Sequence, residues 1–259
     1  MSTPPPSPSG ARLAIRIVVG GLIVVIGAVA LLNVFTSANM EEATDSYPGI
    51  AALDLDLRNG PVVVVAGETD EVVVEKSYTT GFLGGTTEAE VDGDTLRLIQ
   101  RCPAIFGFGC RSSYRVTVPA ATTVTGRTSN GAIRIDGLDG AIDVATSNGA
   151  VDLERLTSTV TARTSNGAVS GTGLLSSDLD VSTSNGRVTL EFAQAPSSVR
   201  VTTSNGEIDV TLPEDSPPYA VSTSTSNGRV SNEIRTDPAA GETIDLRTSN
   251  GDISLRYPG

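Results

Sequence analysis

Histidine and tryptophan are both absent from this chain of 259 residues. Without histidine there can be no Ser-His-Asp or Cys-His nucleophile and no histidine-containing zinc site. Aromatic residues make up only 4% of the chain, so a core must be built from Val, Ile, Leu, Ala and Thr. These absences exclude a whole class of nucleophilic and metal chemistry and indicate a core of small aliphatic side chains.

Basic charge is also scarce. Lys76 is the only lysine, and the formal net charge is −12. Because neutralising phosphates requires a basic surface, we expect no nucleic-acid partner. The Gly-Gly-x-Gly-x-Asp runs of calcium-binding repeats are missing as well, so we expect no metal and no cofactor. The acidic balance is typical of an exposed repeat protein that must stay soluble.

One long apolar segment is present, at residues 17–35, and its only polar side chain is Asn33. As a helix it would span about 28 Å, close to the roughly 30 Å of a bilayer's hydrocarbon core. Arg12 and Arg16 precede it, and acidic residues follow it. By the positive-inside rule, the segment predicts a single-pass plasma-membrane anchor with a cytoplasmic N-terminus.

A cleaved signal peptide is the alternative for this segment, although Thr36-Ser37-Ala38 is a poor cleavage site and the apolar region is long. Either way, the rest of the chain is exported. We therefore expect four parts: a disordered cytoplasmic tail, the anchor, a linker and one extracytoplasmic domain. Their bounds are 1–16, 17–35, 36–47 and 48–259, the domain having an irregular part at 48–120 and a repeat part at 121–259.

Cys102 and Cys110 are the only cysteines. Outside the cytoplasm, two cysteines that close a short loop predict a disulfide, while a redox pair would have Cys-x-x-Cys spacing. Phe106 and Phe108 lie inside this loop. They fit a contact tip for a partner, and they equally fit a cover folded over one end of the domain.

The tetrapeptide Thr-Ser-Asn-Gly occurs seven times, at intervals of 18 to 23 residues. A short motif at such a period indicates stacked supersecondary units. Apolar and polar residues alternate on both sides of each copy, as in strands with one buried face. The pattern therefore predicts that each copy forms a strand, a corner and a second strand, in which Asn and Gly provide a left-handed backbone at the corner.

Two all-β architectures fit this pattern. Asn-Gly is a strong signal for antiparallel hairpins, which would form a β-meander. We favour a β-solenoid, because stacked corners explain why Thr and Ser are kept in every copy. The motif asparagines would then form an internal ladder. These are Asn130, Asn148, Asn166, Asn185, Asn205, Asn227 and Asn250.

The connections opposite the motif lengthen along the chain, from around 137–140 to 212–218 and 236–242. In solenoids such insertions often mark the binding face, so we expect a ligand there or at the cysteine loop. Leu57-Arg58-Asn59-Gly60 resembles a degenerate first copy. The less regular part before residue 120 is expected to cap one end of the stack.

An irregular β half, the segment Val116-Thr117-Val118-Pro119 and the Thr-Ser-Asn-Gly copies together resemble the bacterial "putative adhesin" family of β-strand-repeat proteins. This family is a domain of unknown function, and the resemblance covers about residues 48–258. It implies a β-solenoid at the cell envelope and supplies no catalytic residues.

The sequence thus favours a membrane-anchored binding or scaffold module, with a cell-envelope glycan or protein as its partner. An accessory or sensory subunit of an envelope-stress pathway, acting through the cytoplasmic tail, is the alternative. A polysaccharide-cleaving β-helix would need clustered carboxylates. Acidic residues here are expected to be scattered over a solvated surface, so we expect no enzyme; they include Asp136, Asp143, Asp152, Glu154 and Asp209.

Overall fold

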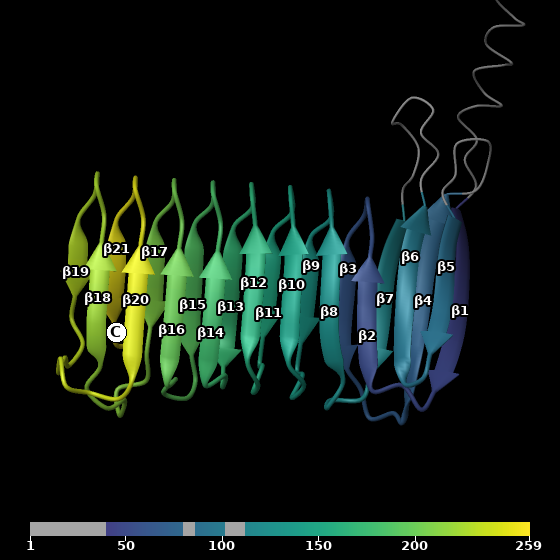
Figure 1. Cartoon of the computed structure of the whole chain (residues 1–259), viewed down its shortest axis with the longest axis horizontal. Helices are drawn as coiled ribbons and strands as arrows, with labels where there is room; N and C mark the ends of the chain where they lie inside the picture. Colours follow the sequence, from purple (N-terminus) through teal and green to yellow (C-terminus); the bar gives the residue numbers. More distant parts are fainter. Residues whose placement is uncertain (1–39, 80–85, 102–111) are drawn as a thin grey trace, which may run out of the picture.

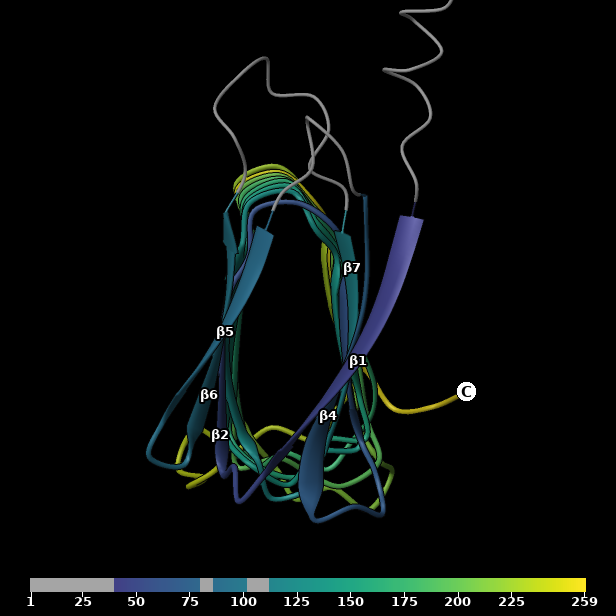
Figure 2. The same ribbon diagram turned by 90° about the vertical axis from the view of Figure 1, so that its right-hand side faces the viewer.

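Two long β-sheets face each other across a shared core (Figure 1). The computed structural model describes residues 40–79, 86–101 and 112–259. Within these residues sheet A has 11 strands and sheet B has 10. Seen end-on, the sheets are the two long sides of a flattened coil (Figure 2).

The strands of each sheet follow a fixed spatial order. Sheet A runs β1 (Met40–Pro48), β4 (Glu71–Thr79), β7 (Ser112–Val118), β3 (Val62–Ala66), β9 (Ile133–Asp136), β11 (Val151–Glu154), β13 (Val169–Leu174), β15 (Val188–Phe192), β17 (Ile208–Thr211), β21 (Ile253–Arg256), β19 (Val230–Asn232). Sheet B runs β18 (Ala220–Ser224), β20 (Thr243–Arg247), β16 (Ser198–Thr202), β14 (Asp178–Ser182), β12 (Val160–Thr164), β10 (Ile142–Thr146), β8 (Thr123–Thr128), β2 (Ala52–Asp56), β6 (Thr95–Arg101), β5 (Thr86–Asp92).

Neighbouring coils are parallel and in register. Ile142 of β10 pairs with Val124 of β8 and with Val160 of β12. Each repeat unit therefore contributes one strand to sheet B, a Thr-Ser-Asn-Gly corner and one strand to sheet A. Because the two strands that flank a corner belong to opposite sheets, the hairpin alternative is wrong and the solenoid-like stack is confirmed.

The core lies between the sheets and consists of stacked rows of aliphatic side chains. In β10 the buried residues Ile142, Val144 and Thr146 alternate with outward residues. Full burial of one such aliphatic side chain contributes about 1.5–3 kcal/mol. Repetition of this alternation in each coil explains how a chain with few aromatic residues can build a continuous core.

The last two coils do not stack in sequence order. The coil formed by β20 and β21 lies between the β16–β17 coil and the β18–β19 coil, because β21 pairs with both β17 and β19. At inward positions Thr223 is paired with Leu246, and Asn232 is paired with Leu255. The more apolar coil thus occupies the interior, and the polar coil closes the open end, as expected for a capping repeat.

This order explains the long connections, which we expected to bulge out as binding loops. Residues 212–219 connect β17 to β18 and leave the position of one coil between them. Residues 233–242 then lead from β19 back to β20, which fills that position. The connections also pack as a cap: Tyr219 is buried and its hydroxyl donates to the Pro196 carbonyl at 2.9 Å. Their length therefore serves the crossover.

The N-terminal end of the stack is closed by antiparallel strands. β1 and β4 extend sheet A, and β5 extends sheet B. Residues 40–47, expected to belong to a linker, form most of β1 instead. The Lys76 ammonium donates to Asp45 at 2.8 Å, and this bond, which joins β4 to β1, raises the pKa of Lys76.

The expected membrane anchor at residues 17–35 lies outside the described residues. In the part of the chain that the structure describes, no helix is long and apolar enough to cross a membrane.

Candidate binding surface

The repeat corners line one long edge of the solenoid, which we call the ladder edge; the opposite edge is the lower edge. Within each corner, the threonine points inward and the serine and asparagine point outward. The buried Thr146 hydroxyl donates to the Gly131 carbonyl of the preceding coil at 2.9 Å. Threonines 164, 183, 203, 225 and 248 repeat this bond. The threonines therefore tie the coils together.

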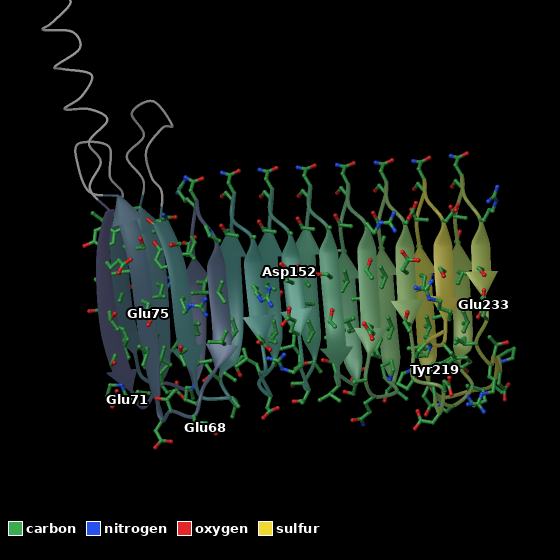
Figure 3. All side chains as sticks on the ribbon, turned by 180° about the vertical axis from the view of Figure 1, so that it is seen from behind. Glu68, Glu71, Glu75, Asp152, Tyr219 and Glu233 are labelled. Atoms are coloured by element: carbon green, nitrogen blue, oxygen red, sulfur yellow. The ribbon has the colours of Figure 1, made fainter. Side chains whose placement is uncertain are left out.

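The asparagine side chains form a continuous row along the ladder edge (Figure 3). Seven amide hydrogen bonds of 2.8–2.9 Å join eight asparagines, including Asn59 of the degenerate copy. The expected internal position of this ladder is wrong, because the seven motif asparagines are exposed. The asparagines therefore form a hydrogen-bonded row on the outer surface of the solenoid.

Asn166 lies in the middle of the ladder and allows a test of its strength. It donates to Asn148 and accepts from Asn185. Because water can replace both bonds at an exposed site, we expect Asn166→Ala to cost about 1 kcal/mol in the free energy of unfolding. Urea unfolding measures this, with Ser165→Ala as the exposed neighbour control. A loss much above that of an ordinary hydrogen bond would mean that the ladder is effectively buried.

The glycine of each corner is needed for space. A Cβ built on Gly149 would lie 1.9 Å from the carbonyl oxygen of Gly131. Of the seven motif glycines, only Gly251 has a positive φ between +20° and +160°, and at 157° it is nearly extended. The expected left-handed corner is therefore wrong, and close approach of successive coils explains the glycine.

Gln100 ends the corner stack on the N-terminal side. Its side-chain carbonyl accepts hydrogen bonds from the backbone amides of Arg58 and Asn59, each at 2.8 Å. Its amide donates to the Asn59 carbonyl and to the Ser112 hydroxyl, each at 3.1 Å. This buried amide satisfies backbone groups that another coil would otherwise satisfy. The sequence analysis missed it, since a single glutamine in a strand carries no distinctive signal.

An open groove runs beside the ladder edge on sheet B. Its volume is about 620 Å³, and it passes over the small Ala145 between Arg127 and Arg163. These two arginines stand on either side of Ala145 in the strand register. The Arg163 guanidinium pairs with Asp143 at 3.0 Å, whereas Arg127 forms no ion pair with a described residue. Exposed Ser147 and Asp56 also line the groove. It therefore combines guanidinium and hydroxyl donors, which suit an anion, with one carboxylate.

Charge is distributed unevenly between the two edges. The turns of the lower edge contain nine acidic residues and two arginines. The acidic residues are Glu68, Asp70, Asp94, Asp139, Glu214, Asp215, Glu233, Asp237 and Glu242. The corners of the ladder edge that the structure describes contain two acidic residues and three arginines, namely Glu207, Asp252, Arg58, Arg187 and Arg229. The strong acidity of the chain is therefore concentrated away from the ladder edge.

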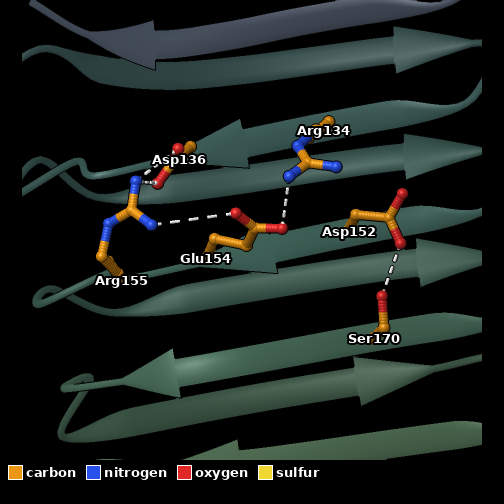
Figure 4. A network of polar contacts seen from close by, with 6 residues as sticks. All are labelled: Arg134, Asp136, Asp152, Glu154, Arg155 and Ser170. Carbon is orange, nitrogen blue, oxygen red and sulfur yellow. Dashed lines mark hydrogen bonds and ion pairs between the residues drawn. The ribbon is translucent and has the colours of Figure 1, made fainter.

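Several carboxylates expected to be scattered are neighbours on sheet A (Figure 4). Glu154 accepts from Arg134 at 2.5 Å, and Arg155 pairs with Asp136. Asp152 accepts from the Ser170 hydroxyl at 2.5 Å. Each carboxylate thus already has a donor partner, so the cluster is well explained as a network that joins adjacent coils.

Arg155 has a φ of 49°, in a row where the neighbouring coils have Gly137 at 75° and Gly173 at 62°. Its ion pairs with Asp136 and Glu154 offset this backbone strain. Among the residues that the structure describes, no group of three or more acidic side chains is arranged to hold a metal.

The expected disulfide between Cys102 and Cys110 and the expected contact tip at Phe106 and Phe108 lie outside the described residues. Their flanking strands are described: β6 ends at Arg101 and β7 begins at Ser112. Since β6 and β7 are parallel to β2 and β3, the end of β6 and the start of β7 both lie at the ladder edge.

Stacked parallel coils with one repeated corner define a β-solenoid-like repeat protein. The Toastrack DUF4097 family model matches residues 110–256, and the chain belongs to this family. This confirms the family resemblance drawn from the motif, over a shorter range than 48–258. A search of the curated proteins found no match.

The chain is also similar to solved structures from several bacteria. A "putative adhesin" of Bacteroides fragilis shares 12% identity, with 86% of this chain and 98% of that chain covered and a TM-score of 0.45. A "putative lipid binding protein" of Parabacteroides distasonis shares 13%, with the same coverage and a TM-score of 0.47. A "putative cell adhesion protein" of Clostridium sporogenes shares 13%, with 85% and 100% covered and a TM-score of 0.37.

Proposed function

We propose that this protein is a non-enzymatic binding or scaffold module of the bacterial cell envelope, held at the plasma membrane by residues 17–35. The observation that carries the proposal is the ladder edge. Seven motif copies are used to build one rigid, regular, exposed row of serine and asparagine side chains. Solenoids of this kind provide extended binding surfaces.

Ion pairs between successive coils support the same proposal. The Arg134–Glu154 and Arg187–Asp209 contacts join residues of successive coils at 2.5 and 3.2 Å. Such cross-coil pairs stiffen a rod, and a stiff rod is what a scaffold needs. In this proposal the extracytoplasmic domain includes β1, and the partner is a glycan or protein of the envelope.

The anchor can be tested by fractionation of the full chain expressed in a bacterial host. We expect it in the membrane fraction, with the domain open to added protease after the envelope is permeabilised. Replacing residues 17–35 with a cleavable signal peptide should release the domain in soluble form. Recovery of the unaltered full chain in the soluble fraction would overturn the membrane-held proposal.

The partner requires a separate experiment. The full chain in nanodiscs is applied to an array of envelope glycans, and a specific hit is expected if the partner is a glycan. The double variant Arg127→Gln/Arg163→Gln tests the groove, with Arg200→Gln on the same sheet as the control. No hits at all would refute the glycan form of the proposal. Loss of function on deletion of residues 1–10 would instead favour signalling through the tail.

A further inference from the structure

The strand register places the start of the described chain at the ladder edge. β3 begins directly after the Asn59 corner and pairs in parallel with β7, so Ser112 at the start of β7 also lies at this edge. Tyr78 pairs with Ser112, and Met40 pairs with Thr79. The described chain therefore enters β1 from the ladder-edge side, where β4 ends and β7 begins.

The distance to the predicted anchor is short. Residues 36–39 are the only ones between the end of the apolar segment and Met40. Fully extended, the five Cα steps from residue 35 to residue 40 reach at most about 18 Å. β1 has nine residues and so is about 27 Å long. Because the strand is longer than the tether, the lower edge cannot reach a membrane that holds residues 17–35.

We propose that the ladder edge lies against the anionic headgroup surface of the membrane into which residues 17–35 insert. This inference rests on the proposed anchor. It adds the orientation of the domain and assigns the ladder edge to a lipid surface, so that a glycan or protein partner would bind elsewhere on the domain. Charge supports it independently of the tether: Arg127, Arg163 and Arg247 are exposed near the ends of sheet B strands on this edge, and they outnumber the exposed Asp56 that pairs with Arg127 in the strand register. An anionic surface attracts these arginines and repels the acidic lower edge.

The lipid contact uses groups already described. The groove between Arg127 and Arg163, with the hydroxyl of Ser147 beside it, offers donors for a lipid phosphate. Asn148 and its neighbours present uncharged amides, which suit the hydrated headgroup layer. The lower edge, with its acidic turns, then points into the envelope and is left free for other partners.

The orientation can be measured because the chain has no tryptophan. Ser184→Trp marks the ladder edge outside the groove and Thr159→Trp marks the lower edge; both residues are exposed. Each full-length variant is reconstituted into phosphatidylglycerol-containing vesicles that carry a dansyl headgroup lipid. We expect energy transfer to dansyl in the Ser184→Trp variant to exceed that in the Thr159→Trp variant several-fold. Equal transfer in both variants, or more from the lower edge, would overturn the proposal.

Two further arms separate the role of charge from that of the anchor. Exchange of phosphatidylglycerol for phosphatidylcholine, or the double variant Arg127→Gln/Arg163→Gln, should reduce transfer from the ladder-edge position, whereas Arg200→Gln should not. Transfer that is insensitive to both would overturn the role of charge. Flotation of the vesicles without the protein would overturn the anchor itself, and so distinguishes failure of the proposed function from failure of the orientation.

Discussion

Gly167→Ala should destabilise the solenoid by more than about 4 kcal/mol, beyond the range of ordinary substitutions. An added Cβ would lie 1.8 Å from the carbonyl oxygen of Gly149 and 2.5 Å from its carbonyl carbon. Both are backbone atoms that cannot rotate away. The same carbonyl accepts the hydroxyl of Thr164, so separating the two coils also breaks a buried hydrogen bond of 2.9 Å.

Urea unfolding of the purified full chain gives the measurement, and Gly241→Ala is the matched control. A Cβ added to Gly241 would meet no heavy atom within 4 Å, and this glycine has no left-handed φ. Alanine there should therefore be neutral within about 0.5 kcal/mol. If Gly167→Ala is too unstable to purify while Gly241→Ala is normal, the prediction holds. Equal stability of both variants would contradict the close approach of the coils.

The repeat architecture was predictable because its signal is redundant. Seven aligned copies of the motif predict the corner. The alternation of apolar and polar residues predicts which side chains point inward, as at Ile142 and Val144. The role of each corner residue was harder to predict. Periodicity does not reveal how close two backbones approach. The sequence therefore predicts a left-handed turn at the glycine and an interior position for the asparagine, and both expectations are wrong.

The spatial order of the coils had a signal in the sequence that is clear only beside the structure. Asn232 breaks the aliphatic pattern after the corner, and Thr223 breaks it before the corner. A coil with polar inward positions is a poor interior coil and a good end coil. Gln100 and the Arg127 groove could not be predicted, because both depend on residues that meet only through the fold.

Leu246→Ala should cost about 3 kcal/mol, within the roughly 2–5 kcal/mol typical of a fully buried leucine. Leu246 is 0% exposed, and it is held between Val201 of one neighbouring coil and Thr223 of the other. This loss of unfolding free energy is expected because the β20–β21 coil lies between two other coils. If the coils stacked in sequence order, Leu246 would belong to the end coil and its loss would leave a smaller cavity.

Thr223→Ala provides the matched comparison, since Thr223 occupies the equivalent inward position in the end coil and is only partly buried. We expect this variant to lose less than about 1 kcal/mol. Hydrogen exchange gives an independent measurement: backbone amides of residues 243–247 should exchange more slowly than those of 220–224, because end coils open more easily than inner ones. The reverse ranking in both experiments would show that the chain stacks in sequence order. The long connections would then lose their role as crossovers and become free loops again.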